Sequence, residues 1–210
     1  MRRSKQFDEL SEAYDSWYER HRSEYLSELG CVRSAVPASG FGLEVGVGTG
    51  RFAAPLGIRV GIDPSGEMLV FARRRGVESV RAVGETIPFA DNVFDYLLLV
   101  VTICFVDDPS AVIAEAGRVL RPGGTILVGI IDRESSLGRL YLRKKDKSPF
   151  YRSARFFSVS EVLDLFPEDG WTDFGFRQTL FAGEPESEKV QESRDGYGDG
   201  SFVAITARKI

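Results

Sequence analysis

The sequence predicts an α/β protein built on a doubly wound, mostly parallel seven-stranded sheet whose last strand is antiparallel. Three observations support this fold class. Short apolar runs alternate with amphipathic segments between residues 41 and 131, which is the pattern of parallel strands joined by helices. A glycine-rich turn at residues 46–50 follows the first apolar run. Two further strand-like runs, 171–181 and 201–208, suggest a terminal hairpin with an antiparallel edge strand.

The composition is that of one soluble globular domain spanning residues 1–210. Hydrophobic residues make up 43% of the chain, and the net charge of −4 gives no electrostatic basis for binding nucleic acid or an anionic membrane. Cys31 and Cys104 are too few for a disulfide framework and lack the spacing of metal ligands, which fits a reducing cytoplasm. The basic start is followed by charged residues, so no signal peptide is expected.

The elements can be placed from periodicity and capping signals. Residues 4–35 carry apolar residues at three- and four-residue spacing and predict a long helix, whereas residues 51–56 leave room for only a very short helix between the first two strands. Ser65 is a suitable N-cap, and Ser158 begins a segment with capping-box spacing. The other predicted elements are strands near 41–46, 58–62, 79–83, 94–101 and 125–131 and helices at 67–75 and 108–120.

The first predicted strand ends in three alternate glycines, Gly46, Gly48 and Gly50. Glycine has no Cβ and tolerates positive φ, so such a turn brings bare backbone close to a ligand. Glu44 lies inside the end of this strand, and Asp63 ends the next apolar run. Two parallel strands that finish in acids, with a glycine turn between them, predict a nucleoside site in which Asp63 accepts hydrogen bonds from both ribose hydroxyls.

The order of the glycines separates two kinds of nucleotide site. A dinucleotide fingerprint is GxGxxG, whereas here the order is GxGxG followed by Arg51. The dinucleotide pattern has no assigned place for Glu44, whose negative charge would repel a pyrophosphate and attract a cationic ligand. Taken alone, the motif is also compatible with a purely structural glycine turn in some other α/β protein.

Four segments carry a family resemblance: residues 43–50 (LEVGVGTG), 61–65 (GIDPS), 87–95 (IPFADNVFD) and 118–124 (RVLRPGG). With these segments in this order and spacing, the chain resembles a class I S-adenosylmethionine-dependent methyltransferase of the small-molecule type. The terminal hairpin is similar to the last strands of that fold. The stretch around Tyr14 resembles the family's lid helix, so residues 1–35 are expected to form N-terminal lid helices.

The resemblance implies S-adenosylmethionine as the cofactor and S-adenosylhomocysteine as the product. Val83 stands where family members often have an acid that meets the adenine amino group, which leaves this contact to the backbone or to Glu85. Thr102, after the fourth strand, would lie beneath the sulfonium. The cofactor-binding residues implied by the resemblance are Glu44, Gly46, Gly48, Gly50, Asp63, Pro64, Gly84, Glu85 and Thr102.

Methyl transfer by in-line displacement depends mainly on positioning and on excluding water. A base is needed only where the acceptor is a hydroxyl or a protonated amine. His21, the sole histidine, is a candidate base because its ordinary pKa lies near physiological pH. It stands between two arginines, so a solvated helix face is the alternative interpretation. Tyr14 and Thr102 complete the predicted catalytic set.

Residues 133–157 are the candidate substrate lid. Eight of them are lysines or arginines against two acids, and aromatic residues are interleaved. A long segment after a strand of this fold lies over the edge where ligands bind, so such a lid would take an anionic or aromatic acceptor. The predicted substrate-binding residues are Tyr18, Tyr151 and Arg155. A solvated basic helix that pairs with the acidic loop at 182–200 is an equally open alternative.

The sequence therefore predicts an enzyme that transfers a methyl group from S-adenosylmethionine to a small-molecule acceptor, without a metal, a nucleic-acid partner or a membrane. Two alternatives stay open. An NAD-dependent oxidoreductase shares the strand, the glycine turn and the ribose acid, and a non-catalytic S-adenosylmethionine-binding protein shares the whole fold. The acceptor, the accepting atom and the oligomeric state are not fixed by the sequence.

Overall fold

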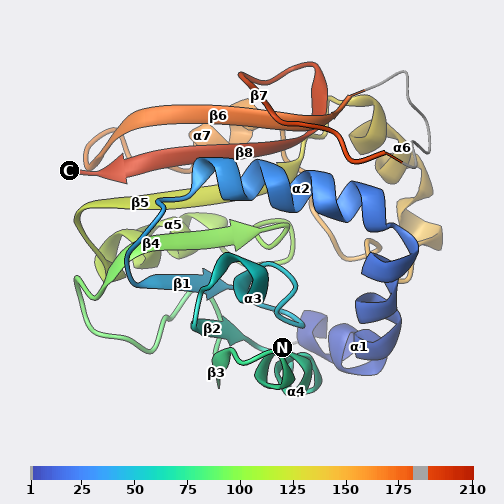
Figure 1. Ribbon diagram of the computed structural model, residues 1–210, viewed down its shortest axis with the longest axis horizontal. Helices are drawn as coiled ribbons and strands as arrows, with labels where there is room; N and C mark the ends of the chain where they lie inside the picture. Colours follow the sequence, from blue (N-terminus) through green and yellow to red (C-terminus); the bar gives the residue numbers. More distant parts are fainter. Residues whose placement is uncertain (1, 182–188) are drawn as a thin grey trace.

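A computed structural model describes residues 2–181 and 189–210, and it has the predicted α/β architecture (Figure 1). None of the described helices combines the length and the apolar character needed to cross a membrane. The strands are β1 (Gly42–Val45), β2 (Val60–Asp63), β3 (Glu78–Arg81), β4 (Phe94–Val100), β5 (Leu120–Ile131), β6 (Trp171–Phe181), β7 (Arg194–Asp195) and β8 (Gly200–Lys209). The helices are α1 (Arg2–Arg20), α2 (Arg22–Ala35), α3 (Ala53–Leu56), α4 (Gly66–Arg74), α5 (Pro109–Val119), α6 (Ser136–Lys144), α7 (Val159–Leu163) and the 3₁₀ turn η1 (Lys145–Lys147).

The sheet order is β3-β2-β1-β4-β5-β8-β6-β7. Strands β1 to β5 pair in parallel, and β8 is antiparallel to both β5 and β6, which confirms a mostly parallel sheet with an antiparallel last strand. Two details differ from the prediction. Strand β8 lies inside the sheet rather than at its edge, and the two-residue β7 makes eight strands instead of seven. Strand β7 is too short to leave a periodic signal and forms only because it pairs with β6.

Helices cover both faces of the sheet. Helices α2, α3 and α4 pack on one face and α5 and α7 on the other. Side chains alternate along β4: Tyr96 and Leu98 contribute to the core under α2, while Leu97 and Leu99 contribute to the core under α5. All four are buried, as the nearly continuous apolar run of this strand predicts.

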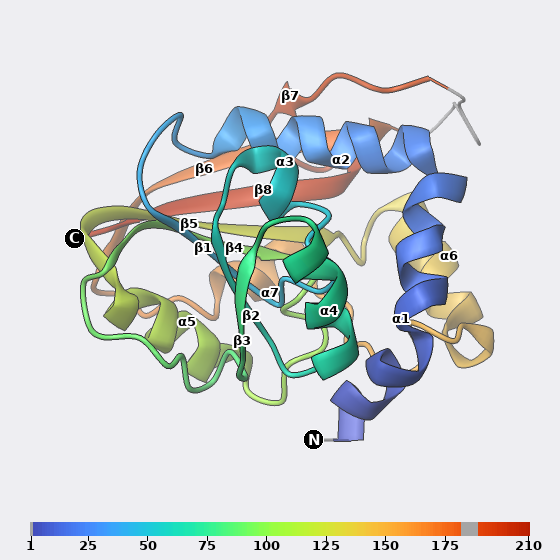
Figure 2. The ribbon, with the colours of Figure 1, turned by 60° about the horizontal axis from the view of Figure 1, so that its bottom comes forward.

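The predicted helix over residues 4–35 is two helices that meet at His21. The backbone of His21 leaves helical geometry, with φ −117° and ψ 47°, and α1 turns away from α2 (Figure 2). Helix α2 lies along the sheet, whereas α1 stands across the ends at which β1 and β4 finish (Figure 1). Periodicity continues through the break because both helices bury an apolar stripe. The bend is decided by the two different surfaces that they bury.

The short crossover after β1 is confirmed. Helix α3 is a single turn, and Gly57 ends it in the left-handed region with φ 75°. The glycine turn is held against β2 by a close contact, because a Cβ on Gly61 would lie only 2.6 Å from the Cβ of Val47. The N–H of Gly46 and that of Val47 both donate to the carbonyl oxygen of Ile62. The turn is therefore fixed to the second strand from its first residues.

Residues 133–157 form α6, η1 and an irregular segment at the same end of the molecule as α1 (Figure 2). Gln6 of α1 donates from Nε2 to the carbonyl oxygens of Pro149 (2.7 Å) and Phe150 (2.9 Å) and accepts from the hydroxyl of Ser153 (3.1 Å). The two candidate lids are thus joined to each other. The predicted acidic loop 182–200 is described only from residue 189 onward, and residues 182–188 lie outside the described part of the chain.

Candidate active site

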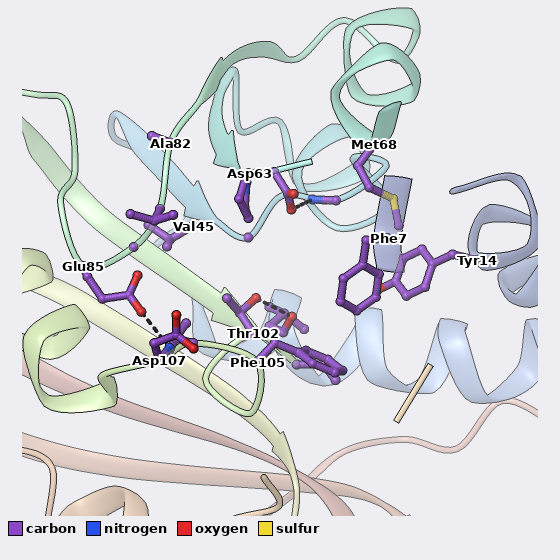
Figure 3. Close-up of a pocket in the computed structure, with 18 residues that line it drawn as sticks. Phe7, Tyr14, Val45, Asp63, Met68, Ala82, Glu85, Thr102, Phe105 and Asp107 are labelled. Carbon is purple, nitrogen blue, oxygen red and sulfur yellow. Dashed lines mark hydrogen bonds between the residues drawn. The ribbon is translucent and has the colours of Figure 1, made fainter. Parts of the chain in front are cut away.

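The main cavity opens at the carboxyl ends of β1, β2 and β4, where the strand order reverses. It has a volume of about 860 Å³ including its open mouth. Figure 3 shows it framed by the strand ends, by the segments that carry Ala82 and Glu85 and that carry Thr102 to Asp107, and by α1. Crevices at such a reversal are the usual ligand sites of doubly wound sheets. Its lining is Phe7, Tyr14, Val45, Gly46, Gly48, Asp63, Pro64, Met68, Ala82, Val83, Gly84, Glu85, Val100, Val101, Thr102, Phe105, Val106 and Asp107.

The glycine turn presents bare backbone to this cavity. Gly46 has φ 74° and Gly48 has φ 51°, conformations that favour glycine. A Cβ on Gly46 would overlap the side chain of Thr102, which lines the cavity from beyond the end of β4. Gly50 also has a positive φ but does not line the cavity, and its bare Cα faces Ala72 of α4. The first two glycines therefore shape the cavity, and the third seats the turn on a helix.

Asp63 ends β2 with its carboxylate at the cavity. Its Oδ2 accepts from the N–H of Gly48 (2.9 Å) and its Oδ1 from the N–H of Ser65 (2.8 Å). The residue is 9% exposed, and burial raises its pKa to about 6 in spite of these two hydrogen bonds. Each carboxylate oxygen has a further lone pair, so Asp63 can still accept hydrogen bonds from a ligand's hydroxyls.

Glu44 lies behind the turn instead of in the cavity lining. Its side chain is 2% exposed and accepts a hydrogen bond from the N–H of Ala53, while its Oε2 has no hydrogen-bond partner. Burial raises the pKa of Glu44 well above its usual range, and Asp63 adds a smaller repulsion. The sequence prediction of direct cofactor contact by Glu44 is therefore not matched by a place in the lining.

The chain after β3 forms the far wall of the cavity. Glu85 accepts from the backbone N–H groups of Asp107 (2.7 Å) and Asp108 (3.2 Å), which ties this wall to the segment after β4 (Figure 3). Gly84 is needed for close packing, because a Cβ there would lie 3.0 Å from Val45. Val83 lines the cavity and is 41% exposed, so an apolar surface stands where the family often has an acid.

Helix α1 closes the cavity with aromatic rings. Phe7 and Tyr14 point inward from it and meet edge to face, with 5.9 Å between ring centroids (Figure 3). The helix is anchored by Asp15, whose carboxylate accepts from Arg51 (2.9 and 2.8 Å) and from Arg75 (2.9 Å). These ion pairs join the lid helix to the residue that follows the glycine turn and to the end of α4.

A second, smaller cavity lies behind this lid, with a volume of about 520 Å³ including its mouth. It shares Tyr14, Val101 and Phe105 with the main cavity. Val101 has φ 51°, which is unusual for a β-branched residue and marks a constrained backbone at the shared wall. The full lining is Tyr14, Trp17, Tyr18, Glu28, Val101, Phe105, Ile131, Tyr141, Phe150 and Tyr151.

The structure brings most of the predicted site residues together but not all of them. Tyr18 and Tyr151 line the second cavity. Arg155 lies outside both linings, with its guanidinium 4.5 Å from the centre of the Phe157 ring. Residues predicted to bind the cofactor that line the main cavity are Gly46, Gly48, Asp63, Pro64, Gly84, Glu85 and Thr102, and Tyr14 lines both cavities.

Two of the predicted catalytic residues, His21 at the break between α1 and α2 and Tyr14 of α1, have partners of their own. The ring of His21 stacks on Trp17, with 4.4 Å between centroids, and its Nδ1 lies 3.0 Å from the carbonyl oxygen of Trp17. It is not among the residues that line either cavity. Burial raises the pKa of Tyr14 well above its usual range, and its hydroxyl lies 2.8 Å from that of Tyr18. Tyr14 is therefore a neutral phenol at physiological pH.

Sequence reasoning missed Glu28 and Phe105 as cavity residues, whereas Tyr141 and Phe150 are two of the aromatic residues interleaved in the candidate lid. Glu28 lies on the second half of the predicted long helix, where an acid followed by Leu29 looks like part of an ordinary amphipathic pattern. Only its burial, at 5% exposure, separates it from a solvated acid. Local pattern therefore held no signal for this residue.

The fold and the strand-end site define a class of protein that binds a nucleoside-containing cofactor. Residues 43–128 match the family model of a methyltransferase domain. The chain is 46% identical to a protein from Thermotoga maritima described as a SAM-dependent methyltransferase, possible histamine N-methyltransferase. The match covers 98% of this chain and 99% of that one, and the two structures align with a TM-score of 0.94.

Two further relatives are similar in sequence. An uncharacterized protein of Methanocaldococcus jannaschii is 45% identical over 204 residues, which cover 97% of this chain and 98% of that protein. A demethylmenaquinone methyltransferase of Tropheryma whipplei is 32% identical over 176 residues, which cover 79% of this chain and 70% of that protein. The chain belongs to the class I S-adenosylmethionine-dependent methyltransferases.

The residues of the main cavity fit the cofactor of this family. The lining offers bare backbone at the glycine turn and the Asp63 carboxylate, while the raised pKa of Glu44 leaves this buried side chain neutral behind the turn. Among the described residues that line the cavity there is no lysine, arginine or histidine. A pyrophosphate would find no cation there, whereas a sulfonium would meet a complementary potential.

Proposed function

We propose that the protein transfers a methyl group from S-adenosylmethionine, held in the main cavity, to a small molecule held in the second cavity. The observation that carries this proposal is the shared wall: Tyr14, Val101 and Phe105 line both cavities, so a donor and an acceptor can meet across these residues. The cofactor supplies an electrophilic methyl group, whose bond to sulfur breaks with its electron pair left on sulfur while the acceptor's lone pair forms the new bond.

The chain's own residues have binding and positioning roles in this proposal. Asp63 holds the ribose hydroxyls, and the backbone of Gly46 to Gly48 lies against the methionine portion. The wall formed by Val83 to Glu85 would hold the adenine, with an apolar side chain where family members often have an acid. Thr102 would hold the sulfonium end of the cofactor. Because in-line transfer requires three collinear atoms, holding the reactants and excluding water account for most of the rate gain.

The aromatic lid excludes water in this arrangement. Phe7 and Tyr14 close the main cavity, and Gln6 holds the 149–153 segment that closes the second one. The description of the Thermotoga maritima protein as a possible histamine N-methyltransferase makes histamine the first acceptor to try for this chain. A wider panel of amines, alcohols and carboxylates, with detection of S-adenosylhomocysteine, covers the other acceptor classes.

Calorimetry of the purified protein with S-adenosylmethionine and with NADH tests the cofactor directly. We expect binding of the first and none of the second. Asp63→Ala should lose about 1.5–3 kcal/mol of cofactor binding, because its carboxylate accepts charge-assisted hydrogen bonds. Asp169→Ala, which removes an exposed acid far from the cavity lining, is the control and should bind as the wild type does.

Two results would contradict the proposal. Unchanged cofactor affinity in Asp63→Ala would show that the ribose is held elsewhere. Binding of S-adenosylmethionine without S-adenosylhomocysteine formation across the whole acceptor panel would favour a binding protein that has kept the fold.

A further inference from the structure

The second cavity contains a buried carboxylate without a partner. Glu28 of α2 lines this cavity at 5% exposure. Within residues 2–181 and 189–210, its carboxylate takes part in no hydrogen bond or ion pair. Burial, with a smaller contribution from Glu24, raises its pKa to about 8. A buried acid is normally satisfied by a donor or a cation, so the missing partner of Glu28 points to a ligand.

The surroundings of Glu28 favour a positively charged ligand. Among the described residues that line the cavity there is no lysine, arginine or histidine, so an anionic ligand would meet the carboxylate with no compensating cation. A cation would meet the carboxylate and the faces of aromatic rings. The aromatic residues of this lining are Tyr14, Trp17, Tyr18, Phe105, Tyr141, Phe150 and Tyr151.

The titratable side chains around Glu28 also leave it as the proton acceptor of the cavity. Burial raises the pKa of Tyr14, Tyr18, Tyr141 and Tyr151 above the usual range, so these phenols stay protonated. They can donate hydrogen bonds but cannot take a proton from a bound molecule at physiological pH. Glu28 can take a proton in its ionised form, which is the minor form in the empty cavity at pH 7 because its pKa is about 8, and which a bound cation favours.

We infer that Glu28 selects an amine as the methyl acceptor: an ammonium group pairs with the buried carboxylate while the body of the acceptor packs among the aromatic rings. One N–H bond of the ammonium then breaks, its proton passes to a carboxylate oxygen of Glu28, and the nitrogen keeps the lone pair that attacks the methyl carbon. This inference rests on the proposed function, because it assigns the acceptor class for the same reaction.

The test compares matched amines and alcohols by calorimetry on the full chain without cofactor. The pairs are 2-phenylethylamine with 2-phenylethanol and tryptamine with tryptophol, which differ in charge but little in shape. We expect each amine to bind about 10- to 100-fold more tightly than its alcohol, the range of one charge-assisted contact. Glu28→Gln should remove this preference and leave the affinity for S-adenosylmethionine unchanged.

Glu24→Gln is the matched control, since Glu24 is one turn earlier on α2 and is not among the cavity-lining residues. It should keep the preference for amines. In turnover assays, Glu28→Gln should raise the KM of an amine acceptor by the same 10- to 100-fold.

The inference would be overturned if neither amine binds more tightly than its alcohol, if 3-phenylpropionate binds more tightly than either amine, or if Glu28→Gln keeps the preference. If Glu28→Gln fails to fold, the comparison of amines with alcohols on the wild-type protein still tests the inference. Absence of S-adenosylmethionine binding in the wild type would instead overturn the proposed function. Amine selectivity in the same protein would stand as a separate result.

Discussion

The two cavities share a wall but are built in different ways. The main cavity is shaped by backbone at strand ends: Gly46 and Gly48 leave their Cα atoms bare, and Asp63 is held by two backbone N–H groups. The second cavity is shaped by side chains from α1, α2, α6 and the 149–151 segment. The shape of the main cavity therefore depends mainly on the geometry of the crossover after β1. The shape of the second cavity depends on contacts between helices that are distant in sequence.

This difference teaches how the two ligands are recognised. The main cavity, where we propose that the cofactor binds, offers the backbone of a turn, which side-chain substitutions change little. The second cavity, where we propose that the acceptor binds, offers an aromatic wall and one carboxyl group, which single substitutions can alter without disturbing the sheet. Variants in the two cavities should therefore differ in which ligand they affect.

The largest effect is expected for Gly46→Ala, which tests the backbone-built cavity. Gly46 has φ 74°, and a Cβ there would overlap Thr102, so we expect a loss of roughly 3–5 kcal/mol in unfolding free energy together with loss of cofactor binding. Urea denaturation measures the unfolding free energy, and calorimetry measures cofactor binding. Gly57→Ala has a similar φ of 75° with open space around it, so it isolates backbone strain and should cost less. Equal losses in the two variants would contradict the overlap with Thr102.

The next effect concerns stability at the side-chain-built cavity. Glu28 has an ordinary pKa of 4.5 that is raised to about 8 by folding, so the folded state holds the proton more tightly and wild-type stability falls as pH rises between these values. Glu28→Gln should lack this fall and be more stable than the wild type by about 3 kcal/mol at pH 7. Thermal or urea unfolding from pH 4 to 9 measures it. Parallel curves for the two proteins would show that Glu28 is not desolvated.

A smaller effect is expected at the helix that both cavities share. Burial opposes ionisation of Asp15, but hydrogen bonds from Arg51 and Arg75 hold its pKa at about 2. Asp15 therefore stabilises the fold above its ordinary pKa of 3.8, and this stabilisation is lost as pH falls toward 2. At neutral pH, Asp15→Asn should cost about 1–2 kcal/mol and weaken cofactor and acceptor together, with Glu12→Gln on the same helix as control. Weakening of only one ligand would show that α1 does not close both cavities as a unit.

The smallest effect is expected at His21, which touches the second cavity only through Trp17. His21→Ala should change the activation free energy derived from kcat by less than about 1 kcal/mol. If His21→Ala changes the KM of the acceptor, His21→Phe should return this KM to the wild-type value, because it keeps a ring against Trp17. A base would behave differently: both variants would then lose about 10²–10⁴-fold in turnover. Steady-state kinetics with one acceptor separates the two outcomes.

Most of the residues that the sequence assigned to the cofactor site lie together at the main cavity, because their positions depend on local structure. The glycine turn, the acid that ends β2 and the short crossover all lie within residues 42–63, and pairing of β1 with β2 brings them together automatically. The contact of Glu44 with the cofactor stays a prediction, and the structure places this side chain behind the turn. The direction in which the Glu44 side chain points depends on how α3 packs against the turn. A one-turn helix is too short for periodicity in the sequence to predict this packing.

The sequence suggested only part of the second cavity, namely Tyr18 and the lid aromatics Tyr141, Phe150 and Tyr151. The basic residues of 133–157 suggested an anionic or aromatic acceptor, but Arg155 stacks on Phe157 outside the lining while Glu28 enters it from α2. A charge count over a segment cannot tell which charges face a cavity. That depends on the bend at His21 and on the clamp between Gln6 and the 149–153 segment, both of which are tertiary contacts.

The alternation of strands and helices, the glycine turn and the place of Asp63 at a strand end are properties that the sequence alone determined, because periodicity and turn geometry depend on near neighbours in the chain. The tertiary structure decided that the long N-terminal helix breaks in two, that β8 enters the sheet between β5 and β6, and that Glu28 is buried among aromatic rings. Each of these outcomes depends on which surfaces meet when distant segments pack, since only that packing removes the solvent which would otherwise satisfy a lone carboxylate.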